Sequence, residues 1–186
     1  MSTKIYSYKV IIIGDGSVGK TSLIKRFVHD KFDKEYVNTL GSDITKFNSD
    51  IDGHEVKLLL WDLAGQSGFE QIINNFFSGS NAAIIVFSHE ENDIGEKSFR
   101  NILKWRQDVL KLRGNIPIIL FGNKIDLVGI EKLENNIDYS KSDINVGKLA
   151  EGLGFLEYIK TSALSGANVT EAFNTIIKAL YQRQKK

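Results

Sequence analysis

One stretch near the amino terminus restricts the possible folds more than any other part of this sequence. The segment Gly14–Thr21 fits the pattern G-x-x-x-x-G-K-[ST] and directly follows the apolar run Val10–Ile13. Glycines let a backbone wrap a phosphate with its N–H groups pointing inward. The amino end of a following helix adds partial positive charge. The sequence therefore predicts a strand, a phosphate-binding loop and a helix, in that order.

Each polar position of this loop has an expected role. Lys20 can bridge the outer phosphates of a nucleotide, and the Thr21 hydroxyl can ligate Mg²⁺. The predicted nucleotide contacts from this loop are Asp15, Gly16, Ser17, Val18, Gly19, Lys20, Thr21 and Ser22. A dinucleotide-binding loop of the form G-x-G-x-x-G, or a purely structural glycine turn, also fits the glycines. The dinucleotide site is disfavoured because Asp33 and Glu35 precede any second strand, and because the Lys-Thr pair has no role there.

Short apolar runs alternate with longer segments of helical spacing along the chain. Runs that are apolar on both faces are typical of parallel strands covered by helices, so the pattern indicates a doubly wound α/β sheet. The helical segments include Phe99–Leu110 and Val169–Leu180. The six expected strands are Tyr8–Ile13, Asp43–Ile51, Glu55–Trp61, Ala82–Phe87, Ile116–Phe121 and Phe155–Ile159.

One pair of strands breaks this alternation. Asp52-Gly53 between the second and third runs predicts a tight hairpin, and hence one antiparallel edge strand on a mostly parallel sheet. About five helices are expected on the two faces. We see no linker or repeat, so residues 1–186 are expected to form a single domain. In such sheets ligands bind at the carboxyl ends of the strands, where the notable loops fall.

Composition excludes several classes of protein. The chain has no cysteine, which excludes disulfides, Cys-ligated metals and a thiol nucleophile. Lys and Arg number 24 against 23 Asp and Glu, so no global charge favours nucleic acid, and no nucleic-acid partner is expected. The longest purely hydrophobic run, Ala82–Phe87, is far shorter than the about 20 residues of a membrane span. We expect a cytoplasmic protein.

Three further loops follow predicted strands. Asp62 ends the third strand and is placed to hold Mg²⁺, while Gly65 lets its N–H approach a terminal phosphate. Asp126, in Gly122–Asp126, can accept hydrogen bonds from N1–H and the exocyclic amine of guanine, which adenine cannot supply. After the sixth strand, the backbone N–H of Ala163 could donate to guanine O6.

Together these four motifs, at these positions and in this order, resemble those of the Ras superfamily of small GTPases, over about Tyr8–Leu180. Within it the chain is most similar to the Rab branch, on stretches such as Lys57–Asp62 and Gly122–Leu127. The resemblance implies the Ras-like fold of P-loop NTPases, GTP/GDP and Mg²⁺ as ligands, and slow hydrolysis of GTP. Two switch loops would change with the nucleotide and control partner binding, in trafficking-like or signalling processes.

The resemblance also implies roles for single residues. Thr39 would ligate Mg²⁺ and sense the γ-phosphate, Gln66 would orient the attacking water, and Lys20 would assist in catalysis. Phe32 would stack edgewise on the guanine, Lys124 would lie over it, and Asn123 would tie the guanine loop to the phosphate loop. The implied nucleotide contacts beyond the phosphate loop are Phe32, Tyr36, Thr39, Gly65, Asn123, Lys124, Asp126, Ser162, Ala163 and Leu164, and the metal ligands are Thr21, Thr39 and Asp62.

Several positions depart from the family pattern. Leu63 stands where Thr is usual, and Ser67–Glu70 lacks the usual arginine of the second switch. Segments Ser88–Lys97 and Gly129–Lys141 look longer than their usual counterparts, the first also more acidic. Further departures are Ser42, Ile44 and Leu164. No arginine finger is evident, and Arg26 is expected to be a surface residue.

These features define the expected partners and the alternatives. An exchange factor, a GTPase-activating protein and effectors would bind residues 32–44 and 64–78 of a monomer. Without cysteine the chain carries no prenylation site, so we expect no lipid anchor and at most indirect recruitment to membranes. The alternatives are a GTP-binding module with little hydrolysis, and a P-loop ATPase or small-molecule kinase.

Overall fold

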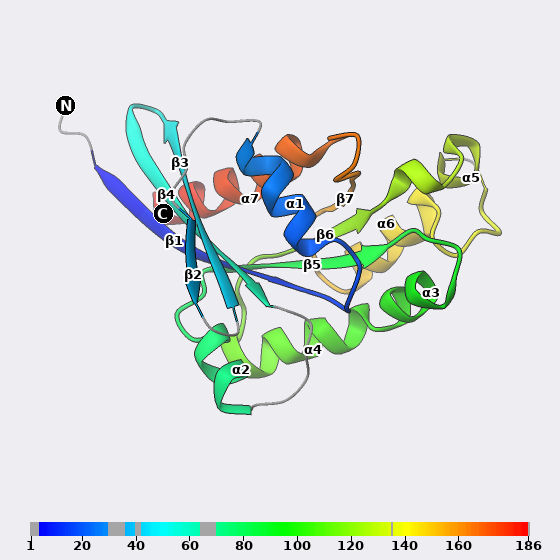
Figure 1. Ribbon diagram of the computed structural model, residues 1–186, viewed down its shortest axis with the longest axis horizontal. Coiled ribbons are helices and arrows are strands. Elements are labelled where there is room, and N and C mark those ends of the chain that lie inside the picture. The colour runs from blue at the N-terminus through cyan, green and yellow to red at the C-terminus, as the bar shows by residue number, and fades with distance from the viewer. Residues whose placement is uncertain (1–3, 30–35, 40–41, 64–69, 135, 186) are drawn as a thin grey trace.

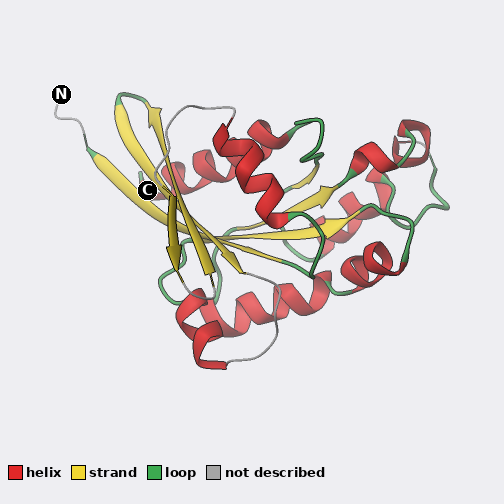
Figure 2. Cartoon of the chain, in the orientation of Figure 1, coloured by secondary structure: helices red, strands yellow, loops and turns green. Residues whose placement is uncertain are grey.

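A single twisted sheet forms the centre of the molecule (Figures 1 and 2). The computed structural model describes residues 4–29, 36–39, 42–63, 70–134 and 136–185. Within these residues the sheet has seven strands, in the order β2-β3-β4-β1-β5-β6-β7. They are β1 (Ile5–Ile13), β2 (Tyr36–Thr39), β3 (Ser42–Ile51), β4 (His54–Leu63), β5 (Ala82–Ser88), β6 (Ile118–Asn123) and β7 (Tyr158–Lys160).

The strand pairing confirms the predicted fold class and places the loops together. Strand β1 pairs parallel with β4 and β5, and β6 pairs parallel with β5 and β7. Strand β3 pairs antiparallel with β2 on one side and with β4 on the other, the latter through a hairpin in which Asp52 and Gly53 both have positive φ, 54° and 75°. Because β1, β4, β5, β6 and β7 share one direction, the loops that follow them meet at one edge of the sheet.

Helices cover both faces (Figure 1). Helices α1 and α7 pack on one face, where Phe27 stacks on Phe173 with ring centroids 4.2 Å apart. Helices α2, α4 and α6 pack on the other through buried residues such as Phe76 and Val146. The bounds are α1 (Lys20–His29), α2 (Glu70–Phe77), α3 (Asp93–Arg100), α4 (Ile102–Arg113), the 3₁₀ turn η1 (Ile125–Leu127), α5 (Ile130–Glu134), α6 (Asp143–Gly152) and α7 (Val169–Gln184).

The element counts and some bounds predicted from sequence were wrong. The described residues contain a seventh strand, β2, which pairs antiparallel with β3 and takes the edge position predicted for β3. They contain seven α-helices rather than about five, because Asn101 forms a turn between α3 and α4 and because α5 lies in the segment 129–141. The last strand begins at Tyr158 rather than Phe155, and β6 begins at Ile118 rather than Ile116.

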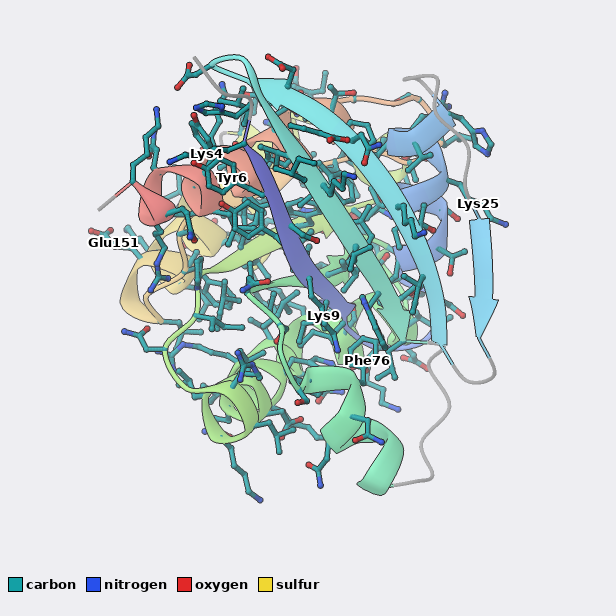
Figure 3. All side chains as sticks on the ribbon, turned by 90° about the vertical axis from the view of Figure 1, so that its left-hand side faces the viewer. Lys4, Tyr6, Lys9, Lys25, Phe76 and Glu151 are labelled. Atoms are coloured by element: carbon teal, nitrogen blue, oxygen red, sulfur yellow. The ribbon has the colours of Figure 1, made fainter. Side chains whose placement is uncertain are left out.

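The sheet also fixes the end of α2. Lys9, labelled in Figure 3 beside Phe76, reaches from β1 towards that helix. Its Nζ donates to the main-chain oxygens of Asn75 and Ser78, at 3.2 and 2.8 Å, and lies 3.7 Å from the centre of the Trp61 ring. In the part of the chain that the structure describes, no helix combines the length and apolar character needed to span a membrane.

Candidate functional site

The glycines of the phosphate loop are required by their surroundings. Gly14 has φ 143°, and a Cβ there would collide with the carbonyl oxygen of Val86 in β5. Gly19 has φ 96°, and a Cβ there would collide with the side-chain amide of Asn123. By contrast, a Cβ at Gly16 would meet no atom of the described residues within 4 Å. Gly14 and Gly19 therefore determine the path of the loop, and Gly16 adds no side chain to it.

Lys20 begins α1 and lies inside the loop that precedes it. Its side chain is only 6% exposed, and its Nζ donates to the carbonyl oxygens of Gly14 and Asp15, both at 2.8 Å. Burial lowers the pKa of Lys20, while the nearby carboxylates of Asp62 and Asp15 oppose this shift. A buried ammonium group at the centre of a phosphate loop is a strong attractor for an anion.

Thr21 and Asp62 meet where a metal ion is expected. The Thr21 hydroxyl donates to Oδ2 of Asp62, which is 4% exposed at the end of β4. An alcohol and a carboxylate oxygen suit Mg²⁺, which proteins bind through one or two such ligands together with substrate phosphates. Among the described residues no three acidic or histidine side chains gather into a metal cluster. The two oxygens therefore fit a Mg²⁺ held jointly with a nucleotide.

The side chain of Asp15 serves the scaffold. Its two carboxylate oxygens accept hydrogen bonds from Asn101 Nδ2 at 2.7 Å and Trp105 Nε1 at 2.8 Å. These donors lie at the start of α4, so the carboxylate is turned towards that helix. The backbone N–H of Asp15 can still donate to a phosphate, because the carboxylate that would repel the phosphate is turned away. Ser17, with φ 65°, and Ser22 are exposed.

Asn123 joins three loops at the carboxyl end of β6. Its Nδ2 donates to the carbonyl oxygen of Val18, at 2.8 Å, which is the tie that the resemblance implied. Its Oδ1 accepts from the Ala163 backbone N–H at 3.1 Å and the Thr161 hydroxyl at 3.4 Å. The side chain is 1% exposed. One amide therefore links the phosphate loop to both loops expected to hold the base.

The residues expected to read the base are held beside this amide. Asp126 lies in η1, exposed, and its Oδ1 accepts a hydrogen bond from the buried Ser162 hydroxyl at 2.5 Å. A carboxylate has about four acceptor positions, so it can still accept two more hydrogen bonds. Lys124 precedes η1 in the left-handed conformation, with φ 66°. The structure thus brings together the predicted residues of the two base loops.

Arg26, expected to be a surface residue, is partly exposed and also holds a distant loop. Its Nε donates to the carbonyl oxygen of Ala163 at 3.0 Å, and its guanidinium also donates to the carbonyl oxygen of Leu164. The Leu164 side chain is 74% exposed, so the loop is held through its backbone. The contact joins α1 to a loop 137 residues away along the chain, and no local sequence pattern could have indicated it.

Sequence reasoning also missed a buried cluster behind the base loops. His89 is fully buried, and its Nε2 lies 3.0 Å from the Tyr158 hydroxyl. Burial, together with Lys141 and Lys160, lowers the pKa of His89 to about 3. A Cβ at Gly122 would collide with this imidazole, so His89 and Gly122 fix each other. The only sequence signal was the extended acidic segment 88–97.

Five predicted site residues lie wholly or partly outside the described part of the chain. Phe32, Gly65 and Gln66 lie outside the described residues. Tyr36 and Thr39 are described only as backbone positions of β2. Their roles stay predictions.

Comparison with known proteins agrees with this geometry. The sequence model of the Ras family matches residues 9–182. The chain is 34% identical to Ras-related protein Rab-13 of Bos taurus over 172 residues, covering 92% of this chain and 78% of that protein. It is 32% identical to GTP-binding protein yptV5 of Volvox carteri over 184 residues, covering 96% and 84%. The family match includes every loop described above.

Proposed function

The chain belongs to the Ras family of small GTPases, and we propose that the loops described above take the roles such a switch requires. The family relationship shows a Rab-like protein that binds GTP and GDP with Mg²⁺ and hydrolyses GTP. We assign each of these roles to particular residues of this chain. The observation that carries the assignment is the buried Asn123 amide, which joins the phosphate loop to both base loops.

Lys20, Thr21 and Asp62 bind the phosphate end. Lys20 Nζ, now on two loop carbonyls, is positioned to turn to the β- and γ-phosphate oxygens and to neutralise their charge. Thr21 and Asp62 would hold Mg²⁺, with Thr39 as a further ligand in the GTP state. When bound, this ion supplies charge neutralisation at the phosphates. Gln66 orients the attacking water, and Gly16 has no side chain that could obstruct it.

Asp126, Lys124 and Ala163 bind the base. Asp126 accepts from N1–H and the 2-amine of guanine, Ser162 holds the carboxylate for this purpose, and the Lys124 stem lies over the ring. Ala163 would share its N–H between Asn123 and guanine O6. The ATPase and kinase alternatives are not favoured, because adenine has neither the N1–H nor the 2-amine that Asp126 would accept from.

Exchange of Asp126 for Asn tests the assignment. Two charge-assisted hydrogen bonds are lost, so affinity for GDP should fall by about 100-fold or more. Xanthosine diphosphate, which carries oxygen in place of the 2-amine, should bind the variant better than GDP. Asp138→Asn, a change of an exposed acid in segment 129–141, is the matched control and should leave both affinities unchanged. A variant that still prefers GDP would contradict the role of Asp126.

Regulators and effectors are general partners of the family, and their docking segments are our proposal. We assign them to residues 32–44 and 64–78, ordered by the γ-phosphate through Thr39 and Gly65. Hydrogen exchange should be slower in both segments with a non-hydrolysable GTP analogue than with GDP. Equal exchange would exclude them as switches.

The remaining proposals rest on the sequence. Residues 1–186 are proposed to form one domain that acts as a monomer, which light scattering tests. A cytoplasmic location and a role in trafficking or signalling are tested by fractionating cells that express the native protein.

A further inference from the structure

Two segments that looked extended in the sequence are locked together next to the base loops. Lys132 Nζ contacts both Glu91 carboxylate oxygens, at 2.6 and 2.7 Å. Lys141, fully buried, bridges Glu96 Oε1 at 2.8 Å and the Glu90 carbonyl oxygen at 2.7 Å. Segments 88–97 and 129–141 thus form one unit, which we call the paired segments.

Glu90 is the fixed point of this unit. Its carboxylate accepts from the Ser88 hydroxyl at 3.0 Å, and its backbone N–H donates to the same hydroxyl at 3.2 Å. A Cβ at Gly95 would collide with the Glu90 carbonyl, so α3 packs directly against the Glu90 backbone. The hydrogen bond from Lys124, followed by that from Ser88, holds the pKa of Glu90 below its usual value, against the opposing effect of burial. The carboxylate is therefore ionised and held in place.

The partner of this carboxylate is the lysine proposed to lie over the base. Lys124 Nζ is 2.5 Å from Glu90 Oε2, and the two side chains are only 25% and 18% exposed. An unpaired lysine samples many rotamers of its four-carbon stem, and fixing them costs about 2 kcal/mol. An anchored Nζ limits the stem to few conformations before a nucleotide arrives.

We propose that Glu90 is a positioning residue for guanine-nucleotide binding: it holds Lys124 Nζ so that the lysine stem is presented to the base, and thereby slows nucleotide release. The paired segments act through this one contact, which connects them to the residence time of the nucleotide. The inference rests on the proposed role of Lys124. It assigns no part in phosphate chemistry to Glu90.

A neighbouring ion pair provides a matched control. Glu91 and Lys132 also join the paired segments, but their side chains are 46% and 39% exposed, and their ion pair involves no base-loop residue. Exposed pairs contribute little to stability. Glu91→Gln therefore removes the same chemical group, one residue away, without touching Lys124.

The test is the release of a fluorescent GDP analogue from the full chain loaded with nucleotide and Mg²⁺. Glu90→Gln should speed release by about three- to tenfold, while Glu91→Gln leaves it unchanged. Single-turnover GTP hydrolysis by Glu91→Gln should equal that of the unchanged protein. Ser88→Ala, which only loosens Glu90, should speed release by about twofold and provides a reading if Glu90→Gln folds poorly.

A double-mutant cycle separates this inference from its premise. Lys124→Met alone should speed release, and adding Glu90→Gln to it should have no further effect. Equal effects of Glu90→Gln with and without Lys124 would overturn the positioning role, as would unchanged release in Glu90→Gln. Unchanged release in Lys124→Met would instead overturn the role of Lys124 over the base.

Discussion

Exchange of Asn123 for Ala tests the centre of the site most directly. The amide makes three hydrogen bonds, to the Val18 carbonyl at 2.8 Å, from the Ala163 N–H at 3.1 Å and from the Thr161 hydroxyl at 3.4 Å. Alanine removes all of them at a position that is 1% exposed. The perturbation therefore affects three loops at once.

The expected loss of stability depends on whether water can replace Asn123 at each of its hydrogen-bond partners. The oxygen at Val18, a fully buried residue, loses a partner where water cannot easily replace it, which costs about 1–3 kcal/mol. Ala163 is half-buried, so its N–H can reach water, and this loss is about 1 kcal/mol. The 3.4 Å contact of Thr161 adds little. We expect the free energy of unfolding to fall by about 2–4 kcal/mol.

Urea unfolding of the GDP-bound protein measures this quantity. Because bound nucleotide itself stabilises the native state, GDP affinity must be measured for each variant and its contribution subtracted. Asn115→Ala, at an exposed asparagine before β6, should change the stability by less than about 0.5 kcal/mol. A corrected loss for Asn123→Ala no larger than that of this control would refute the idea that the amide joins the loops.

Three other changes probe separate parts of the molecule. Gln66→Leu should abolish most GTP hydrolysis while leaving GTP binding intact, and unchanged phosphate release in single turnover would exclude the role of Gln66. Thr21→Ala should remove most of the Mg²⁺ dependence of GDP release, measured by titrating the ion, whereas a wild-type dependence would place the ion elsewhere. The folded-state pKa of His89, about 3, lies below the 6.5 expected when unfolded, so its neutral form stabilises the fold above pH 6.5 and the benefit is lost as pH falls. From pH 8 to pH 5 this lowers the free energy of unfolding by about 2 kcal/mol. In urea unfolding, the stability of His89→Gln should therefore depend less steeply on pH than that of the unchanged protein, and parallel pH dependences would contradict this.

The parts predicted correctly from sequence are those with short-range causes. The phosphate loop followed from glycine spacing behind an apolar run, and the hairpin followed from Asp52-Gly53, whose positive φ values the pattern anticipates. The buried central strands were recognised because every residue of Ala82–Ser88 is buried, which leaves a continuous apolar run.

The parts that were missed depend on distant partners. Strand β2 has no apolar run of its own and exists through its pairing with β3. The chain before β7 already pairs with β6 through Leu156 and Glu157, yet regular strand begins only at Tyr158. Arg26 and Glu90 belong to no sequence motif, because each acts through a partner in a loop elsewhere in the chain.

The arrangement of these long-range contacts bears on how the switch uses its binding energy. Asn123, Arg26 and Asp15 already hold the base and phosphate loops by hydrogen bonds within the protein. Little of the binding free energy of a nucleotide is therefore needed to order these loops. GDP and GTP share the base and the first two phosphates, so contacts made there cannot distinguish the two states. Only contacts to the γ-phosphate differ, and under the proposed roles they come from Lys20, which lies outside the two switch segments, and from Thr39 and Gly65, which lie within them. Under the proposed roles, a base side held in this way would separate affinity, set by Asp126 and Lys124, from switching, carried out by the segments 32–44 and 64–78.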